Sequence, residues 1–181
     1  AADITVVRAH IVPVGEDQVP NVEMARALAR RFNNRFGETF ILPEMMQQML
    51  RVPGLDGSKM GKSEADNAID INSPISEIRE RYQKKGVTDL ERKLRTDPGD
   101  PYGRCKSVYP VHEIVTANEV SSREIATKCT RATIGCAECK NVLVDNIGNI
   151  LEPFQERRAQ LAHQNDFVAD VLQEGGKRAR A

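Results

Sequence analysis

A strand pattern that leads through a short polar turn into an amphipathic helix constrains the fold of this chain most. Residues 4–14 are rich in Val and Ile and are interrupted by Arg8-Ala9-His10, which predicts two short strands with a turn between them. Gly15-Glu16-Asp17-Gln18 follows, and Pro20 suits the first turn of a helix. A strand, a polar turn and a helix in this order form a unit of α/β architecture. The predicted helix stops at Gly37, and its apolar residues recur at helical spacing: Val22, Ala25, Leu28, Ala29, Phe32 and Phe36.

The middle of the chain is predicted to combine short helices with a glycine-rich loop. Residues 45–50 are apolar and suggest one or two helical turns, whereas residues 51–67 have the Pro and Gly content of a loop. Ser73-Pro74 then begins a helix, because a capping residue precedes a proline. The apolar stripe of that helix is Ile75, Ile78 and Tyr82.

The last part of the chain is predicted to be helical throughout. Residues 88–110 are irregular, and we place a domain boundary between residues 88 and 89. Apolar spacing predicts a long helix over residues 142–154, which Pro153 kinks or interrupts. A final helix is expected to begin at Asn165-Asp166 and to end at Gly175-Gly176.

The composition excludes several classes of protein. Apolar residues make up 40% and charged residues 29%, which is enough for a core and unlike a disordered tail. Lys+Arg and Asp+Glu both number 26, so a nucleic-acid partner would have to meet a local basic surface. No apolar stretch approaches the roughly 20 residues that cross a bilayer, and no signal peptide is recognisable. We therefore expect a cytoplasmic protein with no membrane partner, whose four cysteines are thiols or metal ligands.

The segment Lys59-Met60-Gly61-Lys62-Ser63 has the character of a phosphate-binding loop. Two lysines three positions apart can converge on a polyphosphate, and glycine lets the backbone approach it closely. A P-loop is excluded, because it requires glycine five positions before Gly61, where this chain has Asp56. Taken by itself, the segment is equally compatible with a solvated lysine-rich loop.

The four cysteines lie in one quarter of the chain. Cys129, Cys136 and Cys139 follow a C-x6-C-x2-C pattern, and Cys105 precedes them. Four thiolates suit tetrahedral zinc or a [4Fe–4S] cluster, and free thiols are the alternative to either.

Together, these motifs resemble the nucleotide-binding half of the class I aminoacyl-tRNA synthetases. Residues 59–63 are similar to the KMSKS signature of that class, with Gly61 where serine is usual and both lysines retained. Within the class, the GEDQ form of residues 15–18 and the opening Ala1-Ala2-Asp3 resemble the tryptophanyl-tRNA synthetase family, whereas tyrosyl enzymes usually have a different residue before Asp-Gln. Two further segments are similar to a bacterial subset of that family, Pro53-Gly54-Leu55-Asp56-Gly57 and Thr96-Asp97-Pro98-Gly99-Asp100.

The resemblance implies a two-domain α/β protein that activates tryptophan with ATP and transfers it to its tRNA. Residues 1–88 would be a partial Rossmann-like nucleotide-binding fold, and residues 89–181 an all-α anticodon-binding domain. The implied ligands are ATP with Mg²⁺, tryptophan and the tryptophan-specific tRNA, and the full-length enzyme would be a homodimer.

The resemblance also implies roles for individual residues. Asp3 would accept the indole N–H, since indole offers one donor and no acceptor. Val52 would lie against the adenine, and Lys59 and Lys62 would hold the departing pyrophosphate. The remaining residues with an implied binding role are Gly15, Glu16 and Asp17 at the ribose, Met60, Gly61 and Ser63 in the ATP-binding loop, and Gln18 at the substrate.

The cysteines also have a counterpart in the resembled family. Some bacterial members hold a [4Fe–4S] cluster on a C-x22-C-x6-C-x2-C motif near the anticodon. Here the first gap is one residue longer, and Lys106-Ser107 follows Cys105 where Pro-Val is typical. The resemblance favours iron–sulfur over zinc on Cys105, Cys129, Cys136 and Cys139. Basic residues nearby that could contact RNA phosphates are Arg123, Lys128, Arg131 and Lys140.

One class signature is missing from the sequence. His10, His112 and His163 are the three histidines, and none belongs to a His-x-Gly-His motif. We therefore expect this chain to represent the C-terminal portion of a synthetase and to be inactive alone. Two alternatives stay open: a non-catalytic tRNA-binding module, and a metal-stabilised helical domain without an RNA partner.

Overall fold

The chain forms two compact units in the computed structural model. One unit comprises residues 1–50 and 171–181, and the other residues 51–170. The predicted boundary at 88/89 lies inside the second unit, and the assignment of 1–88 and 89–181 to two functional domains stays a prediction. The structure describes residues 1–15, 18–47, 52–61, 64, 66–116 and 119–180.

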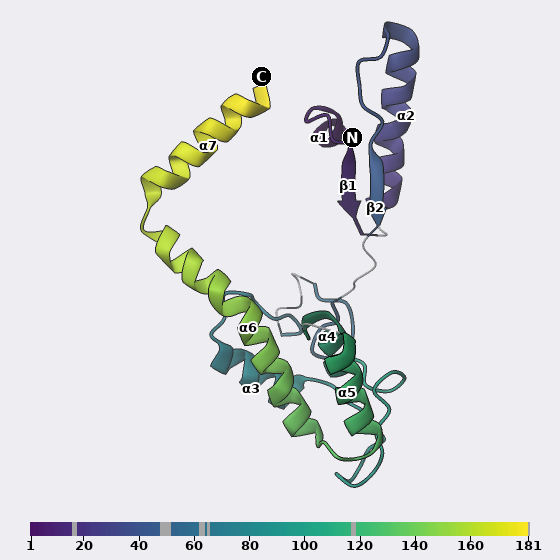
Figure 1. Ribbon diagram of the computed structural model, residues 1–181, viewed down its shortest axis with the longest axis vertical. Helices are drawn as coiled ribbons and strands as arrows, with labels where there is room; N and C mark the ends of the chain where they lie inside the picture. The colour runs from purple at the N-terminus through teal and green to yellow at the C-terminus, as the bar shows by residue number, and fades with distance from the viewer. Residues whose placement is uncertain (16–17, 48–51, 62–63, 65, 117–118, 181) are drawn as a thin grey trace. The chain divides into compact units, whose positions relative to one another are not determined.

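The first unit contains a parallel two-stranded sheet with a helix in its crossover (Figure 1). Strand β1 (Ile11–Val14) pairs in parallel with β2 (Glu44–Gln47), with Ile11 opposite Glu44 and Val14 opposite Gln47. Parallel strands need such a crossover, and α2 (Val19–Phe36) provides it. This β-α-β order confirms the α/β character predicted for this end of the chain.

Two of the local predictions in this unit were wrong. Residues Ala2–Thr5 form the short helix α1, in which the backbone N–H of Thr5 donates to the carbonyl of Ala1 at 3.1 Å, and not a strand. Residues 45–47 are strand and not helix, because pairing with β1 overrides their weak helical pattern.

Helix α2 has the ends that its sequence predicts. Pro20 lies in its first turn, and Gly37 ends it with a φ of 88°, a conformation that favours glycine. Asn33 holds the following loop, since its side chain accepts from the Phe40 N–H at 2.8 Å and donates to the Phe40 carbonyl at 2.7 Å. The helix buries Val22, Ala25 and Ala29, while Leu28, Phe32 and Phe36 are exposed.

The second unit is built around the long helix α6 (Cys136–Ala162). Helices α3 (Ile75–Lys85) and α4 (Val108–Val115) pack against it, and α5 (Glu119–Thr130) packs against α4. An ion pair of 2.7 Å between Arg79 and Asp145 links α3 to α6. The shared core contains Leu55, Ile78, Tyr82, Val108, Tyr109, Leu143, Val144 and Ile147.

Two predicted helix limits were also wrong. Helix α6 extends beyond the predicted residues 142–154 and is not interrupted at Pro153, which lies exposed in its interior, and α7 (Asn165–Arg180) continues through Gly175-Gly176. Pro110 lies in the first turn of α4, where its missing N–H leaves no intrahelical bond unmade. Among the described residues, no helix has the length and apolar character needed to cross a membrane.

Candidate functional site

The chain before the lysine loop folds into a tight hairpin. Pro53 and Lys59 form an antiparallel bridge, and the Gly54 N–H donates to the Ser58 carbonyl at 2.7 Å. Buried Asn67 fastens this hairpin, because its side chain accepts from the Asp56 N–H at 2.9 Å and donates to the Ser58 hydroxyl at 2.8 Å. A Cβ on Gly54 would lie 2.4 Å from the Asn67 amide, so only glycine fits there.

A cavity of about 450 Å³ opens beside this hairpin. Val52, Lys59 and Met60, three of the predicted ATP-binding residues, line it together. Its volume is within the range of small-molecule sites. Gly61 is half-buried at the next position, whereas Lys62 and Ser63 lie outside the described residues. The other lining residues are Pro53, Gly57, Ser58, Lys106 and Pro110.

The remaining predicted substrate residues belong to the first unit. Asp3 lies exposed on α1, and Gly15 is half-buried directly after β1. Gln18 precedes α2 and accepts from the Asn21 side chain at 2.8 Å. Glu16 and Asp17 lie outside the described residues. The proximity of residues 15–18 to the lysine loop therefore stays a prediction.

All four cysteines line one small, largely apolar cavity of the second unit. Cys105 precedes α4, Cys129 lies on α5, and Cys136 and Cys139 occupy the first turn of α6. All four are free thiols, with Cys105 buried and the others half-buried. Apolar parts of the lining come from Pro101, Tyr109, Ile125 and Ile134.

Burial governs the chemistry of these thiols. Burial, together with a smaller effect of the neighbouring thiols, raises the pKa of Cys105 to about 11 and that of Cys139 to about 12. Polar groups also contact three of these sulfurs: the Tyr109 N–H donates to the Cys105 sulfur at 3.3 Å, the Arg92 guanidinium lies 3.9 Å from the Cys129 sulfur, and the His112 Nε2 atom lies 3.4 Å from the Cys139 sulfur. The thiols of Cys105 and Cys139 are therefore protonated near neutral pH unless a bound cation stabilises their thiolates.

Among the described residues, no three His, Cys, Asp or Glu side chains are arranged to hold a single metal ion. A tetrahedral zinc with Zn–S bonds of about 2.3 Å would require sulfurs about 3.8 Å apart. A four-iron cluster differs, because each thiolate binds a different iron and the sulfurs stand further apart. In number and type, the cysteines of this cavity fit the donor set of such a cluster.

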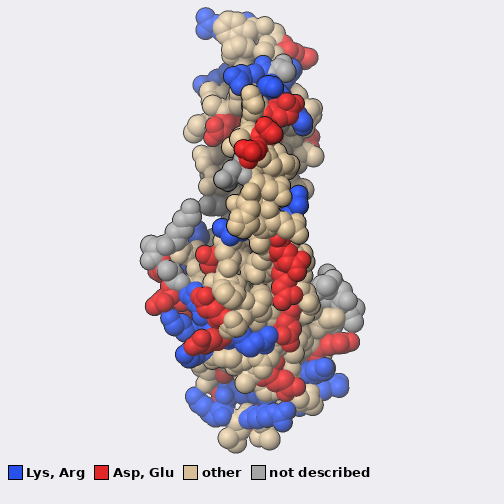
Figure 2. Space-filling model, turned by 90° about the vertical axis from the view of Figure 1, so that its left-hand side faces the viewer, with Lys and Arg blue, Asp and Glu red and all other residues tan. Residues whose placement is uncertain are grey.

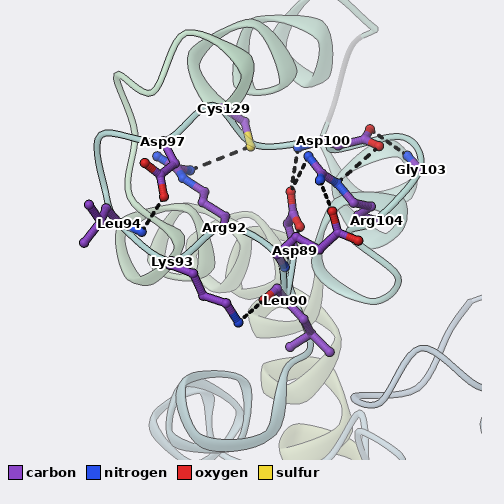
Figure 3. A network of polar contacts seen from close by, with 11 residues as sticks. Asp89, Leu90, Arg92, Lys93, Leu94, Asp97, Asp100, Gly103, Arg104 and Cys129 are labelled. Atoms are coloured by element: carbon purple, nitrogen blue, oxygen red, sulfur yellow. Dashed lines mark hydrogen bonds and ion pairs between the residues drawn. The ribbon is translucent and has the colours of Figure 1, made fainter.

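The segment that covers the cysteine cavity is organised by the buried carboxylate of Asp89 (Figure 3). Its oxygens accept from the backbone N–H of Glu91 at 3.0 Å and of Asp100 at 2.9 Å, and lie 3.3 Å from the Arg104 guanidinium. Burial alone would raise the pKa of Asp89, but these donors and the Arg104 charge outweigh it and lower the pKa.

Gly99 allows this segment, residues 89–104, to pack directly against α5. Its N–H donates to the Cys129 carbonyl at 3.1 Å, and a Cβ at this position would lie 2.5 Å from the Cys129 sulfur. A side chain at residue 99 would therefore displace one of the four thiols.

Three of the basic residues predicted to contact RNA line the same surface depression. Arg123, Lys128 and Arg131 line a depression of about 500 Å³ on α5 together with Glu124. Figure 2 shows Lys and Arg side chains gathered at the end of this unit where α5 ends and α6 begins. Lys140 is different, because its ammonium donates to the Gln83 carbonyl at 3.2 Å and burial lowers its pKa.

The fold and these motifs have clear counterparts among known proteins. The family model for class I tRNA synthetases of tryptophan and tyrosine matches residues 1–152. A tryptophan–tRNA ligase of Deinococcus radiodurans is 43% identical over 100% of this chain and 54% of its own length. One from Thermotoga maritima is 38% identical over 99% of this chain and 54% of its own. The tryptophanyl-tRNA synthetase of Campylobacter jejuni, whose crystal structure contains ADP and tryptophan, superposes with a TM-score of 0.76 at 30% identity, covering 99% of this chain and 55% of that one.

These matches define a class I aminoacyl-tRNA synthetase fold. The chain belongs to the tryptophanyl-tRNA synthetase family, as the resemblance of its motifs predicted. It spans about half the length of the curated relatives it matches.

Proposed function

We propose that this chain carries the ATP-binding lysine loop and the RNA-binding helices of an enzyme that activates tryptophan with ATP and transfers it to its tRNA. The observation that carries the proposal is the cavity shared by Val52, Lys59 and Met60. Its apolar wall suits an adenine ring, and the Lys59 ammonium suits a phosphate. In the sequence, Gly61, Lys62 and Ser63 follow Met60 directly, and we assign them to the same ATP-binding loop.

The proposed chemistry needs positioning and charge, and no side-chain base. The tryptophan carboxylate attacks the α-phosphorus of Mg²⁺-bound ATP, tryptophanyl-adenylate forms, and pyrophosphate leaves. Lys59 and Lys62 stabilise the negative charge that develops on the departing pyrophosphate. Gly15, Glu16 and Asp17 contact the ribose, while Asp3 and Gln18 orient tryptophan.

For the cysteine cavity, we propose a [4Fe–4S] cluster on Cys105, Cys129, Cys136 and Cys139, with zinc as the alternative. The cluster would replace thiol protons that burial makes hard to remove, and would tie α4, α5 and α6 together. Anaerobic preparation should yield iron and acid-labile sulfide in equal amounts with broad visible absorption. Stoichiometric zinc without sulfide would instead support the alternative.

Binding experiments on the 181-residue protein test the main proposal. ATP should bind in the presence of Mg²⁺, and Lys59→Met should weaken that binding about tenfold. The tryptophan-specific tRNA should bind with an affinity that falls steeply with salt. Tryptophan-dependent ATP–pyrophosphate exchange should be undetectable, because the sequence has no His-x-Gly-His motif.

A non-catalytic tRNA-binding module is the second candidate function. The basic hollow of Arg123, Lys128 and Arg131 favours it, because that surface can meet RNA without any nucleotide. Retention of tRNA binding with no measurable affinity for ATP would select this candidate over the first.

A further inference from the structure

Lys106 lines the cavity at the lysine loop although it lies far from that loop in the sequence. Its side chain is exposed and faces the same cavity as Lys59. Neither ammonium has a hydrogen-bond or ion-pair partner within the described part of the chain. Two cations that line one concave site, and that have no ion-pair partner among the described residues, repel each other and favour an anion between them.

Backbone hydrogen bonds hold Lys106 against the hairpin. The Val87 N–H donates to the Leu55 carbonyl at 2.7 Å, and the Ser107 N–H donates to the Val87 carbonyl at 3.3 Å. Gly57, with a φ of 87°, allows the closest approach, since a Cβ there would lie 2.6 Å from the Cβ of Lys106. The main chain of Lys106 is therefore positioned by the same structure that positions Lys59.

We propose that Lys106 is a second phosphate-binding cation of this cavity, which takes the polyphosphate of a nucleotide between Lys59 and Lys106. This inference rests on the proposed function and adds a residue to it. The lining of the cavity combines the apolar residues Val52, Met60 and Pro110 with the two lysines. That combination matches a nucleoside polyphosphate, which has one flat apolar ring and one charged chain.

An RNA backbone fits this cavity less well. Non-specific RNA binding uses several basic side chains along an open surface, and such a surface exists on α5 at Arg123, Lys128 and Arg131. The cavity at Lys106 instead offers two cations with an apolar lining.

Calorimetric titration of the 181-residue protein with Mg²⁺-ATP, pyrophosphate and adenosine tests the inference. Lys106→Met should raise the Kd for ATP and for pyrophosphate about tenfold, or about 1.4 kcal/mol, and leave adenosine binding unchanged. Lys106→Arg keeps the charge and should restore most of the affinity. Lys84→Met, which removes an exposed lysine of α3 that pairs with Glu80, is the matched control and should have no effect. Circular dichroism and thermal unfolding verify that each variant is folded.

These titrations distinguish failure of the inference about Lys106 from failure of the proposed function. If Lys59→Met weakens pyrophosphate binding and Lys106→Met does not, the proposed function stands and the inference is wrong. If Lys106→Met and Lys84→Met weaken ATP and pyrophosphate binding equally, the loss reflects only the change in net charge, and the inference is wrong. Loss of RNA binding alone in Lys106→Met would assign the lysine to RNA. If the unaltered protein binds neither ATP nor pyrophosphate, both ideas fail.

Discussion

His112 is a buried histidine that the fold keeps neutral. Its Nε2 atom donates to the Cys139 carbonyl at 3.2 Å, and its Nδ1 atom lies 3.3 Å from the Thr116 hydroxyl, which donates to it in this tautomer. Burial lowers the pKa of His112 to about 4 and outweighs the Cys139 carbonyl, which acts in the opposite direction. The ring therefore links α4 to the first turn of α6 without a charge.

This burial predicts a pH dependence of stability. An unfolded histidine takes up a proton near pH 6.5, whereas His112 in the folded protein does so only near pH 4. The contribution of His112 to the free energy of unfolding should therefore be constant above about pH 7 and should fall by up to about 3 kcal/mol as the pH falls from 6.5 to 4. Urea denaturation at several pH values measures this. His112→Gln should show a flatter profile, and equal slopes in both proteins would contradict the prediction.

The sequence could predict which residues line the cavity only where those residues are close together along the chain. Val52, Lys59 and Met60 are near neighbours in the sequence; the lysine-loop motif identified Lys59 and Met60, and the family resemblance implied Val52. Lys106 was missed because its position depends on hydrogen bonds between Leu55, Val87 and Ser107. Its only sequence signal was the replacement of the Pro-Val usual after this cysteine in the resembled family.

At the scale of elements, helix α6 contains a glycine that its packing does not require. Gly148 is buried where α6 faces α3, and a Cβ there would lie 3.6 Å from Ile75, an ordinary van der Waals contact. Gly148→Ala should stabilise the protein by about 1 kcal/mol, because alanine favours the helix interior and fills the contact. Denaturant unfolding measures the change. Gly99→Ala is the contrasting variant, since its Cβ would collide with the Cys129 sulfur, and it should destabilise. A destabilised Gly148→Ala would show that the helices cannot accept a methyl group.

The segment of residues 89–104 depends on one carboxylate for its shape. Asp89→Asn keeps the size of the side chain but removes the charge that faces Arg104, and should cost about 2 kcal/mol at pH 7. Because the pKa of Asp89 is lowered in the folded protein, its contribution is present above about pH 4 and is lost below it. The difference between the two proteins should therefore shrink on acidification, as urea denaturation at pH 7 and pH 3 can measure. A difference independent of pH would contradict this account.

The sequence predicted the ends of a helix correctly where its capping residues and its apolar periodicity agreed. The predictions were wrong where contacts with a distant part of the chain determine the structure. Pro20 and Gly37 marked the ends of α2 correctly, because both act through local backbone geometry. Residues 45–47 became a strand because β1 pairs with them. Pro153 did not end α6: a proline can remain in a long helix whose remaining hydrogen bonds and packing hold it.

At the scale of the whole molecule, the two units differ in how much apolar surface they bury. The second unit has a continuous core that joins Leu55, Ile78, Tyr82 and the buried faces of α4 and α6. In the described part of the first unit, the helix α2 buries only Val22, Ala25 and Ala29. Local stability follows buried apolar contacts, so the two units should open with different free energies.

Hydrogen–deuterium exchange with peptide-level mass spectrometry tests this difference. Amides of α3, α4 and α6 should exchange at least about 100-fold more slowly than those of α2, because opening the second unit exposes its whole core. Addition of Mg²⁺-ATP should slow exchange in residues 52–61 and around Lys106 if the proposed nucleotide site is correct, since a ligand that binds the folded form stabilises it. The amides of α5 serve as the internal control, since that helix does not line the nucleotide cavity. Equal protection of α2 and α6 would instead mean that both units unfold in one cooperative step. The two units would then not have separate stabilities, and the prediction would be wrong.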